Sequence, residues 1–80
     1  MNFPVYRKYK NGKSYFKIIN PLLFEEIQVI GTKKVTKQTE AKLFPEKNFV
    51  NDLLFNFKEM ANEISEEEYL KIKSEWFLFA

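Results

Sequence analysis

Six side chains near the start of the chain have the types and spacing to bind a polyanion. They are Tyr6, Lys8, Lys10, Lys13, Tyr15 and Lys17. Single-stranded nucleic acid is held by cations along its phosphates and by flat rings beneath its bases, so tyrosine beside lysine suits that ligand. The same pairing is also an ordinary outer face for a strand, where lysines discourage edge-to-edge association.

These six residues share a face only if a β-hairpin positions them. Asn11-Gly12 lies between two segments of alternating character and predicts a two-residue type I′ turn, with positive φ at both central residues. The resulting register places Val5 opposite Ile18 and the six candidates on one face. The opposite face carries a single charge, Arg7, among the apolar and aromatic side chains of Val5, Tyr9, Phe16 and Ile18.

Catalytic chemistry has few candidate residues, because the chain holds no histidine and no cysteine. Histidine is the side chain that exchanges protons near neutral pH, and cysteine is the most readily activated nucleophile. The carboxylates that remain have no identifiable partner in the sequence: Glu25, Glu26, Asp52 and Glu66–Glu68. The last three suit the first turn of a helix, where negative charge is favourable. We therefore expect no enzyme, no cofactor and no metal site.

The apolar run Trp76-Phe77-Leu78-Phe79 offers a third kind of site. One helix face cannot bury four large apolar side chains in succession. Either the run folds back on the sheet, or a second copy or another protein covers it, or the native chain continues past Ala80. Trp76, Phe77 and Phe79 are therefore the candidate protein interface.

Composition places the chain among small folded proteins. Its 80 residues predict one globular domain, residues 1–80, and hydrophobic residues make up 45% of the chain while the net charge is only +2. The absence of cysteine excludes a disulfide framework and favours a cytoplasmic setting. No apolar run has the length that spans a bilayer, and the N-terminus does not resemble a signal peptide.

Charge is distributed unevenly along the chain. Residues 1–48 hold ten Lys or Arg and four Asp or Glu, a net of +6, whereas residues 49–80 hold three and seven, a net of −4. This asymmetry suits a basic binding surface with an acidic flank. Attraction between the two halves, or solvated surfaces, explains it more simply, because charge segregation is common in small domains.

The remaining elements follow from periodicity and capping signals. Helices are predicted near residues 20–31, 46–61 and 65–78, with Asn20 and Ser65 as N-caps. Alternation predicts a half-exposed strand over 33–43 that ends before Pro45. Two alternatives stay open: residues 22–30, rich in β-branched side chains, suit a strand, and so do residues 60–64.

These elements predict an α+β fold, with an antiparallel sheet of three to four strands packed on two to three helices and one face of the sheet covered. The expected order is ββαβαα, or ββαβ(α)βα. The expected function is a small non-catalytic intracellular protein-interaction module, with a homodimer as one form of that interaction. The alternative is an accessory binder of single-stranded nucleic acid or another polyanion through the hairpin face. No membrane or small-molecule partner is inferred.

Overall fold

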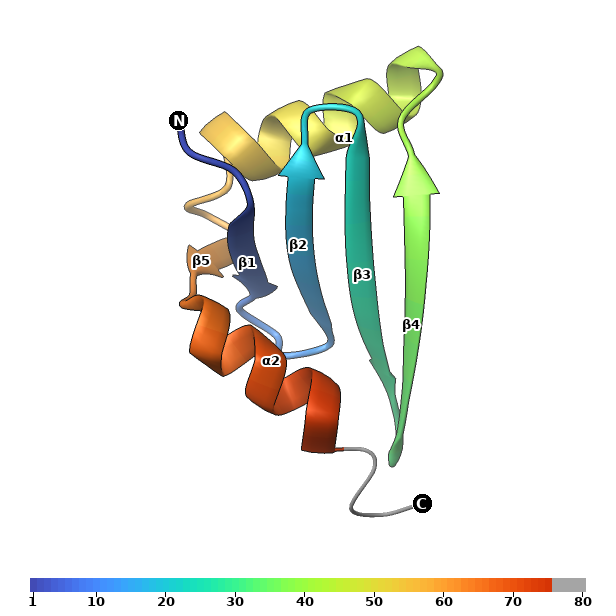
Figure 1. The fold of residues 1–80 in the computed structure, drawn as a ribbon, viewed down its shortest axis with the longest axis vertical. Coiled ribbons are helices and arrows are strands. Elements are labelled where there is room, and N and C mark those ends of the chain that lie inside the picture. Colours follow the sequence, from blue (N-terminus) through green and yellow to red (C-terminus); the bar gives the residue numbers. More distant parts are fainter. Residues whose placement is uncertain (76–80) are drawn as a thin grey trace.

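The computed structural model describes residues 1–75 of the chain, which fold into one sheet and two helices (Figure 1). The elements in chain order are β1 (Val5–Tyr9), β2 (Ser14–Asn20), β3 (Leu23–Ile30), β4 (Lys33–Glu40), α1 (Phe44–Phe55), β5 (Ala61–Glu63) and α2 (Glu66–Glu75). The predicted α+β class is confirmed. The sheet has five strands where three or four were expected, and the order is ββββαβα.

All neighbouring strands are antiparallel, in the order β4-β3-β2-β1-β5. The predicted hairpin register is confirmed, with Val5 opposite Ile18 and Lys8 opposite Tyr15. The predicted type I′ turn is wrong, because no described residue other than glycine has a positive φ. Instead the Gly12 N–H donates to the Tyr9 carbonyl at 2.8 Å, and only Gly12 takes the left-handed conformation, with φ 72°.

The helix predicted over residues 20–31 is a strand, as the alternative interpretation allowed. Asn20 does not cap a helix. Its side-chain oxygen accepts the Leu22 N–H at 2.8 Å, which makes a local turn between β2 and β3. The β-branched residues that follow then pair on both sides, as Ile27 does with Tyr15 and Thr36. Pairing on both sides and the β-branched side chains outweigh the helix-start signal.

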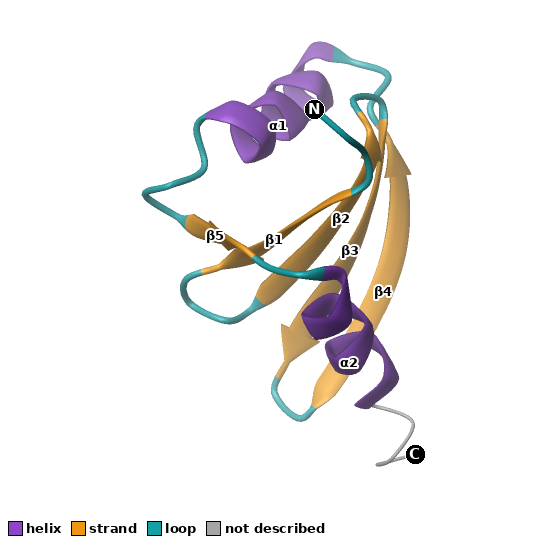
Figure 2. Ribbon diagram, turned by 60° about the vertical axis from the view of Figure 1, so that its left-hand side comes forward, coloured by secondary structure: helices purple, strands orange, loops and turns teal. Residues whose placement is uncertain are grey.

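The two helices lie at opposite ends of the sheet and cover opposite faces, as Figures 1 and 2 show together. The α1 face carries a cluster of buried residues: Phe16, Ile18, Phe24, Ala41, Val50, Leu53 and Leu54. The α2 face carries a second cluster: Tyr6, Tyr15, Ile27 and Tyr69. The expectation of a single covered face is therefore wrong, because α2 turns back over the hairpin after β5.

Helix α1 begins and ends with help from other segments. Pro45 occupies its first turn, and Glu46 accepts the Lys42 N–H at 3.3 Å and places a negative charge at the helix start. Its last turn has no basic residue of its own. The buried Arg7 of β1 replaces one, because its Nε donates to the Leu53 carbonyl at 2.8 Å.

The elements of the C-terminal part also differ in their bounds from those predicted from the sequence. The helix predicted over 46–61 stops at Phe55, and β5 confirms the alternative of a strand near residues 60–64. The predicted N-cap of the last helix is confirmed, since the Ser65 hydroxyl accepts the Glu68 N–H at 3.1 Å. Within residues 1–75, neither helix has the length and apolar character needed to cross a bilayer.

Candidate functional site

The hairpin face predicted to bind a polyanion lies beneath α2. Tyr6, Lys8, Tyr15 and Lys17 do fall on the predicted side of the hairpin, but Tyr6 and Tyr15 are only 8% and 7% exposed. Tyr6 packs against Tyr69 of α2, with ring centroids 5.2 Å apart. The expectation that both rings lie open for base stacking therefore does not match the structure.

The lysines of this face are drawn toward acidic residues. Lys8 lies 3.9 Å from Glu68 of α2, and its Nζ is 5.5 Å from the centroid of the Tyr15 ring. Lys17 pairs across the sheet with Glu25. Lys10 and Lys13 remain exposed beside the turn. Of these contacts, only the one between Lys8 and Glu68 joins the basic first part of the chain to the acidic second part.

A polar cluster fixes α2 to this face. The Tyr69 hydroxyl and the Lys73 ammonium both donate to Oε1 of Glu25, at 2.8 and 2.9 Å. Burial alone would raise the pKa of Glu25, but the hydrogen bonds from Lys73 and Tyr69 outweigh it and the pKa is lowered. Burial, and then the hydrogen bond to Glu25, raise the pKa of the Tyr69 hydroxyl. The Tyr69 hydroxyl and the Glu25 carboxylate bond to each other, so the role of this cluster is structural: it attaches α2 to the sheet.

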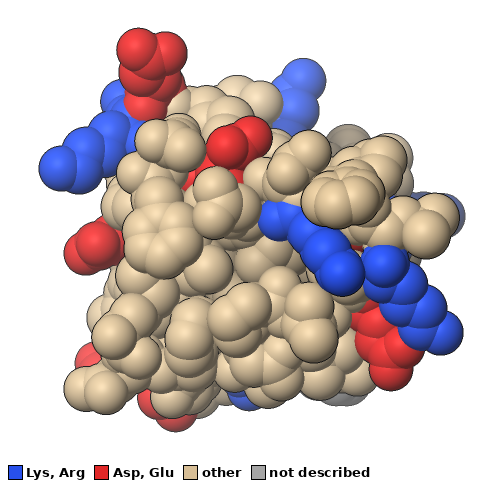
Figure 3. All heavy atoms as spheres, turned by 90° about the horizontal axis from the view of Figure 1, so that it is seen from above, with Lys and Arg blue, Asp and Glu red and all other residues tan. Residues whose placement is uncertain are grey.

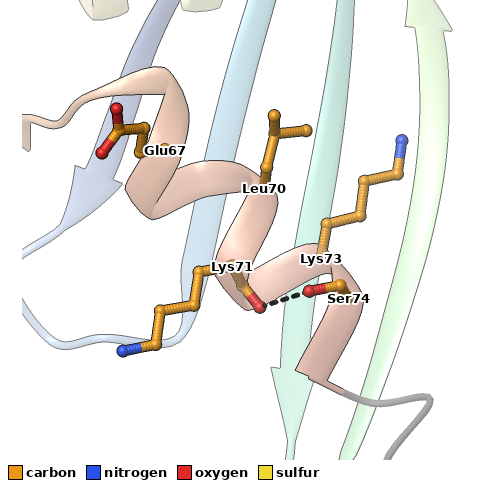
Figure 4. Close-up of a pocket in the computed structure, with 5 residues that line it drawn as sticks. All are labelled: Glu67, Leu70, Lys71, Lys73 and Ser74. Atoms are coloured by element: carbon orange, nitrogen blue, oxygen red, sulfur yellow. Dashed lines mark hydrogen bonds between the residues drawn. The ribbon is translucent and has the colours of Figure 1, made fainter.

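The other carboxylates form no acid–base pair. Glu26 is buried and accepts the Ser14 hydroxyl at 3.0 Å. In the described part of the chain, no three acidic residues gather as a metal site would require. The outer surface of α2 has a hollow lined by Glu67, Leu70, Lys71, Lys73 and Ser74, all from one helix. Figure 4 shows these side chains spreading apart, with only Ser74 bonded to the Lys71 carbonyl, so the hollow assembles no reactive set.

The predicted interface of Trp76, Phe77 and Phe79 lies outside the described residues.

An apolar groove that the sequence did not indicate lies at the α1 end of the molecule. Its volume is about 400 Å³. Three segments far apart in sequence line it: the N-terminus, the β2–β3 turn and one flank of α1. We call it the α1 groove, and its residues are Met1, Phe3, Pro21, Leu22, Lys47, Val50, Asn51, Leu54 and Phe55. Seen from above, this end of the molecule is largely uncharged, with the charged side chains mainly toward its margins (Figure 3).

The exposed apolar side chains of the groove are what set it apart. Phe55 is 64% exposed and Leu22 is 55% exposed, while the floor residues Val50 and Leu54 belong to the core. Phe44, at the other end of α1, is 80% exposed. Isolated exposed apolar residues are common, but several around one hollow usually mark a contact surface.

Lys47 supplies the single charged side chain among the lining residues of the α1 groove. Lys42, its neighbour toward the sheet, pairs with Glu40 at 3.3 Å. Lys47 has no such pair among residues 1–75. The groove therefore combines an apolar hollow with one uncompensated ammonium group.

The sequence holds a partial signal for one groove residue, Phe55, which helical spacing places away from the core stripe of α1. Phe44 and Phe55 are eleven residues apart, close to three full turns, so they lie on one line along α1. That line is not the core stripe, which runs through Val50, Leu53 and Leu54. Nothing in the sequence places Leu22 opposite this flank, because the contact depends on the path of the whole sheet.

Comparison of the chain with protein-family models, with curated proteins and with solved structures finds no match to any of the three. The functional conclusion must therefore come from the chemistry of the site itself.

Proposed function

We propose that the protein is a small non-catalytic intracellular interaction module whose α1 groove binds an apolar segment of a partner protein. The observation that carries this proposal is the pair of exposed apolar side chains, Phe55 and Leu22, on either side of a hollow of about 400 Å³. A hollow of that size accepts a few side chains of a partner. Exposed aromatic anchors at such sites commonly supply most of the binding energy.

The charge of the groove restricts the chemistry of the partner segment. Lys47 has no carboxylate within ion-pair distance among the described residues, so an acidic group of the partner segment would complete the contact. A two-fold contact between two grooves would bring both Lys47 ammonium groups to one interface, which is unfavourable. We therefore assign the groove to a different protein rather than to a second copy. The lack of cysteine in the chain supports an intracellular, cytoplasmic setting.

The hairpin face does not support the nucleic-acid alternative to the same degree, because its two rings are covered by α2. Stacking on bases needs an open ring face. No second function is proposed for it.

A peptide-display selection against the folded protein tests the proposal. Selected peptides are synthesised, and their affinities are measured by calorimetry for the natural chain and for Phe55→Ser, Lys47→Glu and Leu70→Ser. Leu70, on α2, is 47% exposed and lies outside the groove, so its variant is the matched control. We expect apolar peptides with an acidic residue, an affinity loss of about tenfold or more in Phe55→Ser, and no change in Leu70→Ser.

Two results would contradict the proposal. Peptides that bind Phe55→Ser as tightly as the natural chain would place the contact elsewhere. Concentration-dependent sedimentation of the free protein that disappears in Phe55→Ser would assign the groove to a second copy. Lys47→Glu separates the two parts of the proposal, since it should weaken the acidic peptides and leave peptides without an acid unaffected.

A further inference from the structure

Strand β4 forms one edge of the sheet and is not covered by either helix (Figure 2). Its eight residues are mostly exposed, and Val35, near its middle, is 46% exposed. The opposite edge is β5, which has three residues. A long open edge presents unpaired backbone groups that a further strand can use.

The hydrogen-bond pattern shows which backbone groups are open. The Ala41 N–H donates to the Leu22 carbonyl at 2.7 Å, in register with the β3–β4 ladder. Backbone hydrogen bonding alternates along an antiparallel strand, so Val35 and Lys37 also bond to β3. Thr36 and Gln38 alternate with them and turn their N–H and C=O groups away from β3. The β2–β3 ladder agrees, since Val29 donates to the Lys13 carbonyl and so bonds away from β4.

The charge on β4 is mainly basic, and its one acidic residue, Glu40 at the end of the strand, pairs with Lys42 at 3.3 Å. Residues 31–39 contain three lysines and no acidic residue. Lys33 and Lys37 are exposed and fall on the same side of the strand, with Val35 between them. Lys37 lies opposite Glu26 in the β3–β4 ladder. Neither Lys33 nor Lys37 makes an ion pair within the described part of the chain.

We infer that the β4 edge binds an extended acidic segment of a partner protein by strand addition. The backbone groups of Thr36 and Gln38 pair with the added strand. On the side shared by Lys33, Val35 and Lys37, the matching pattern in the partner is acidic, apolar, acidic at alternate positions.

A second copy of the chain fits this edge less well than an acidic segment, because each β4 holds three lysines and one glutamate, so two paired β4 edges would both carry a net positive charge. The β5 edge is short and carries Glu63, so it does not suit an acidic strand. The inference is independent of the α1 groove, since no β4 residue lines that groove.

The test uses two synthetic peptides of about ten residues, one alternating Glu-Thr-Val-Thr-Glu and the other with Lys in place of Glu. Each is titrated into the labelled full chain, and amide shifts and hydrogen exchange are followed by NMR. We expect the acidic peptide to shift residues 33–40 and to slow exchange at Thr36 and Gln38. The basic peptide should have no effect.

Three variants make the test specific. Lys33→Glu with Lys37→Glu should weaken the acidic peptide by roughly tenfold and favour the basic one. Thr36→Pro removes an outward N–H that β3 does not use, so it should abolish binding while the sheet persists. Thr36→Val keeps that N–H and should bind as the natural chain does.

Several outcomes would overturn the inference: no binding at about 1 mM peptide, equal binding of both peptides, or shifts that map away from β4. Concentration-dependent shifts of residues 33–40 in the free protein would assign the edge to a second copy instead. Phe55→Ser is expected to bind the acidic peptide normally, so failure here is distinguishable from failure of the α1 groove.

Discussion

The two faces of the sheet are closed by different kinds of contact. On the α1 face, aromatic and aliphatic side chains interlock, and Phe49 of α1 meets both Phe16 and Phe24 with ring centroids 5.6 Å apart. On the α2 face, the helix is held by Tyr69 and Lys73, which both donate to Glu25. The α1 face therefore depends on buried area, and the α2 face depends additionally on directional bonds that respond to pH.

The comparison also explains where partner surfaces are found. The tyrosine rings of the hairpin face are buried, and the exposed apolar and basic groups lie mainly at the periphery: in the turn with Lys10 and Lys13, in the α1 groove and on the β4 edge. If the two faces are held as described, changing their contacts alters stability in different ways.

The largest effect is expected for Leu53→Ala on the α1 face. Leu53 is fully buried, so its truncation leaves a cavity and should reduce the free energy of unfolding by about 2 to 5 kcal/mol. Urea unfolding measures the change, with Leu70→Ala on the exposed side of α2 as the control. A loss below about 1 kcal/mol would show that α1 is not packed as described.

Tyr69→Phe should cost about 1.5 to 3 kcal/mol near neutral pH, because it removes a buried hydrogen bond to a carboxylate. The pKa of Tyr69 is raised in the folded state, so its stabilisation is present below pH 10 and lost as the pH rises further. The stability gap between the natural chain and Tyr69→Phe should therefore narrow in alkali. A stability difference between the two proteins that stays constant above pH 10 would contradict the role of this bond in attaching α2.

Arg7→Met should cost about 1 to 3 kcal/mol, since the Leu53 carbonyl loses its donor at the end of α1. The guanidinium also lies 4.0 Å from the centroid of the Phe57 ring, so part of the packing goes with it. Thermal unfolding compares Arg7→Met with Arg7→Lys, which keeps the charge. Equal stability of both variants and the natural chain would show that this bond does not hold α1.

The smallest effect is expected for Lys73→Met, below about 1 kcal/mol at neutral pH, because the Lys73 side chain is 40% exposed. The effect of this variant on stability should be clearest at acidic pH. The pKa of Glu25 is lowered in the folded state, so its stabilisation is present above the ordinary pKa of 4.5 and is lost as the pH falls. Without Lys73 that acid-dependent loss should be smaller, as urea midpoints near pH 7 and pH 3 would reveal. An unchanged acid dependence would mean that Lys73 does not act on Glu25.

The parts of the fold that local chemistry determines were predictable. The hairpin register follows from alternation on both sides of Gly12, and the start of α2 follows from Ser65. The helix predicted over residues 20–31 failed because Asn20-Pro21 satisfies a turn and a helix start equally well, and only pairing with β2 and β4 decides between them.

The candidate site was much less predictable. Tyr6 and Tyr15 have the character of exposed binding residues, and their burial depends on the path of α2, which the hairpin sequence does not encode. The α1 groove joins three segments, and its exposed residues Leu22 and Phe55 are 33 positions apart in the sequence. Contacts of that kind arise from tertiary packing, and the only local sign of them is the position of Phe55 away from the core stripe of α1.

The most direct test of the account is the set of intermolecular nuclear Overhauser contacts between the labelled protein and an apolar acidic peptide from the display selection. The α1 groove predicts contacts from the peptide's apolar protons to the Phe55 ring and the Leu22 methyl groups. Contacts to the Tyr6 and Tyr15 rings would contradict it, since they would require α2 to leave the sheet and expose the hairpin face.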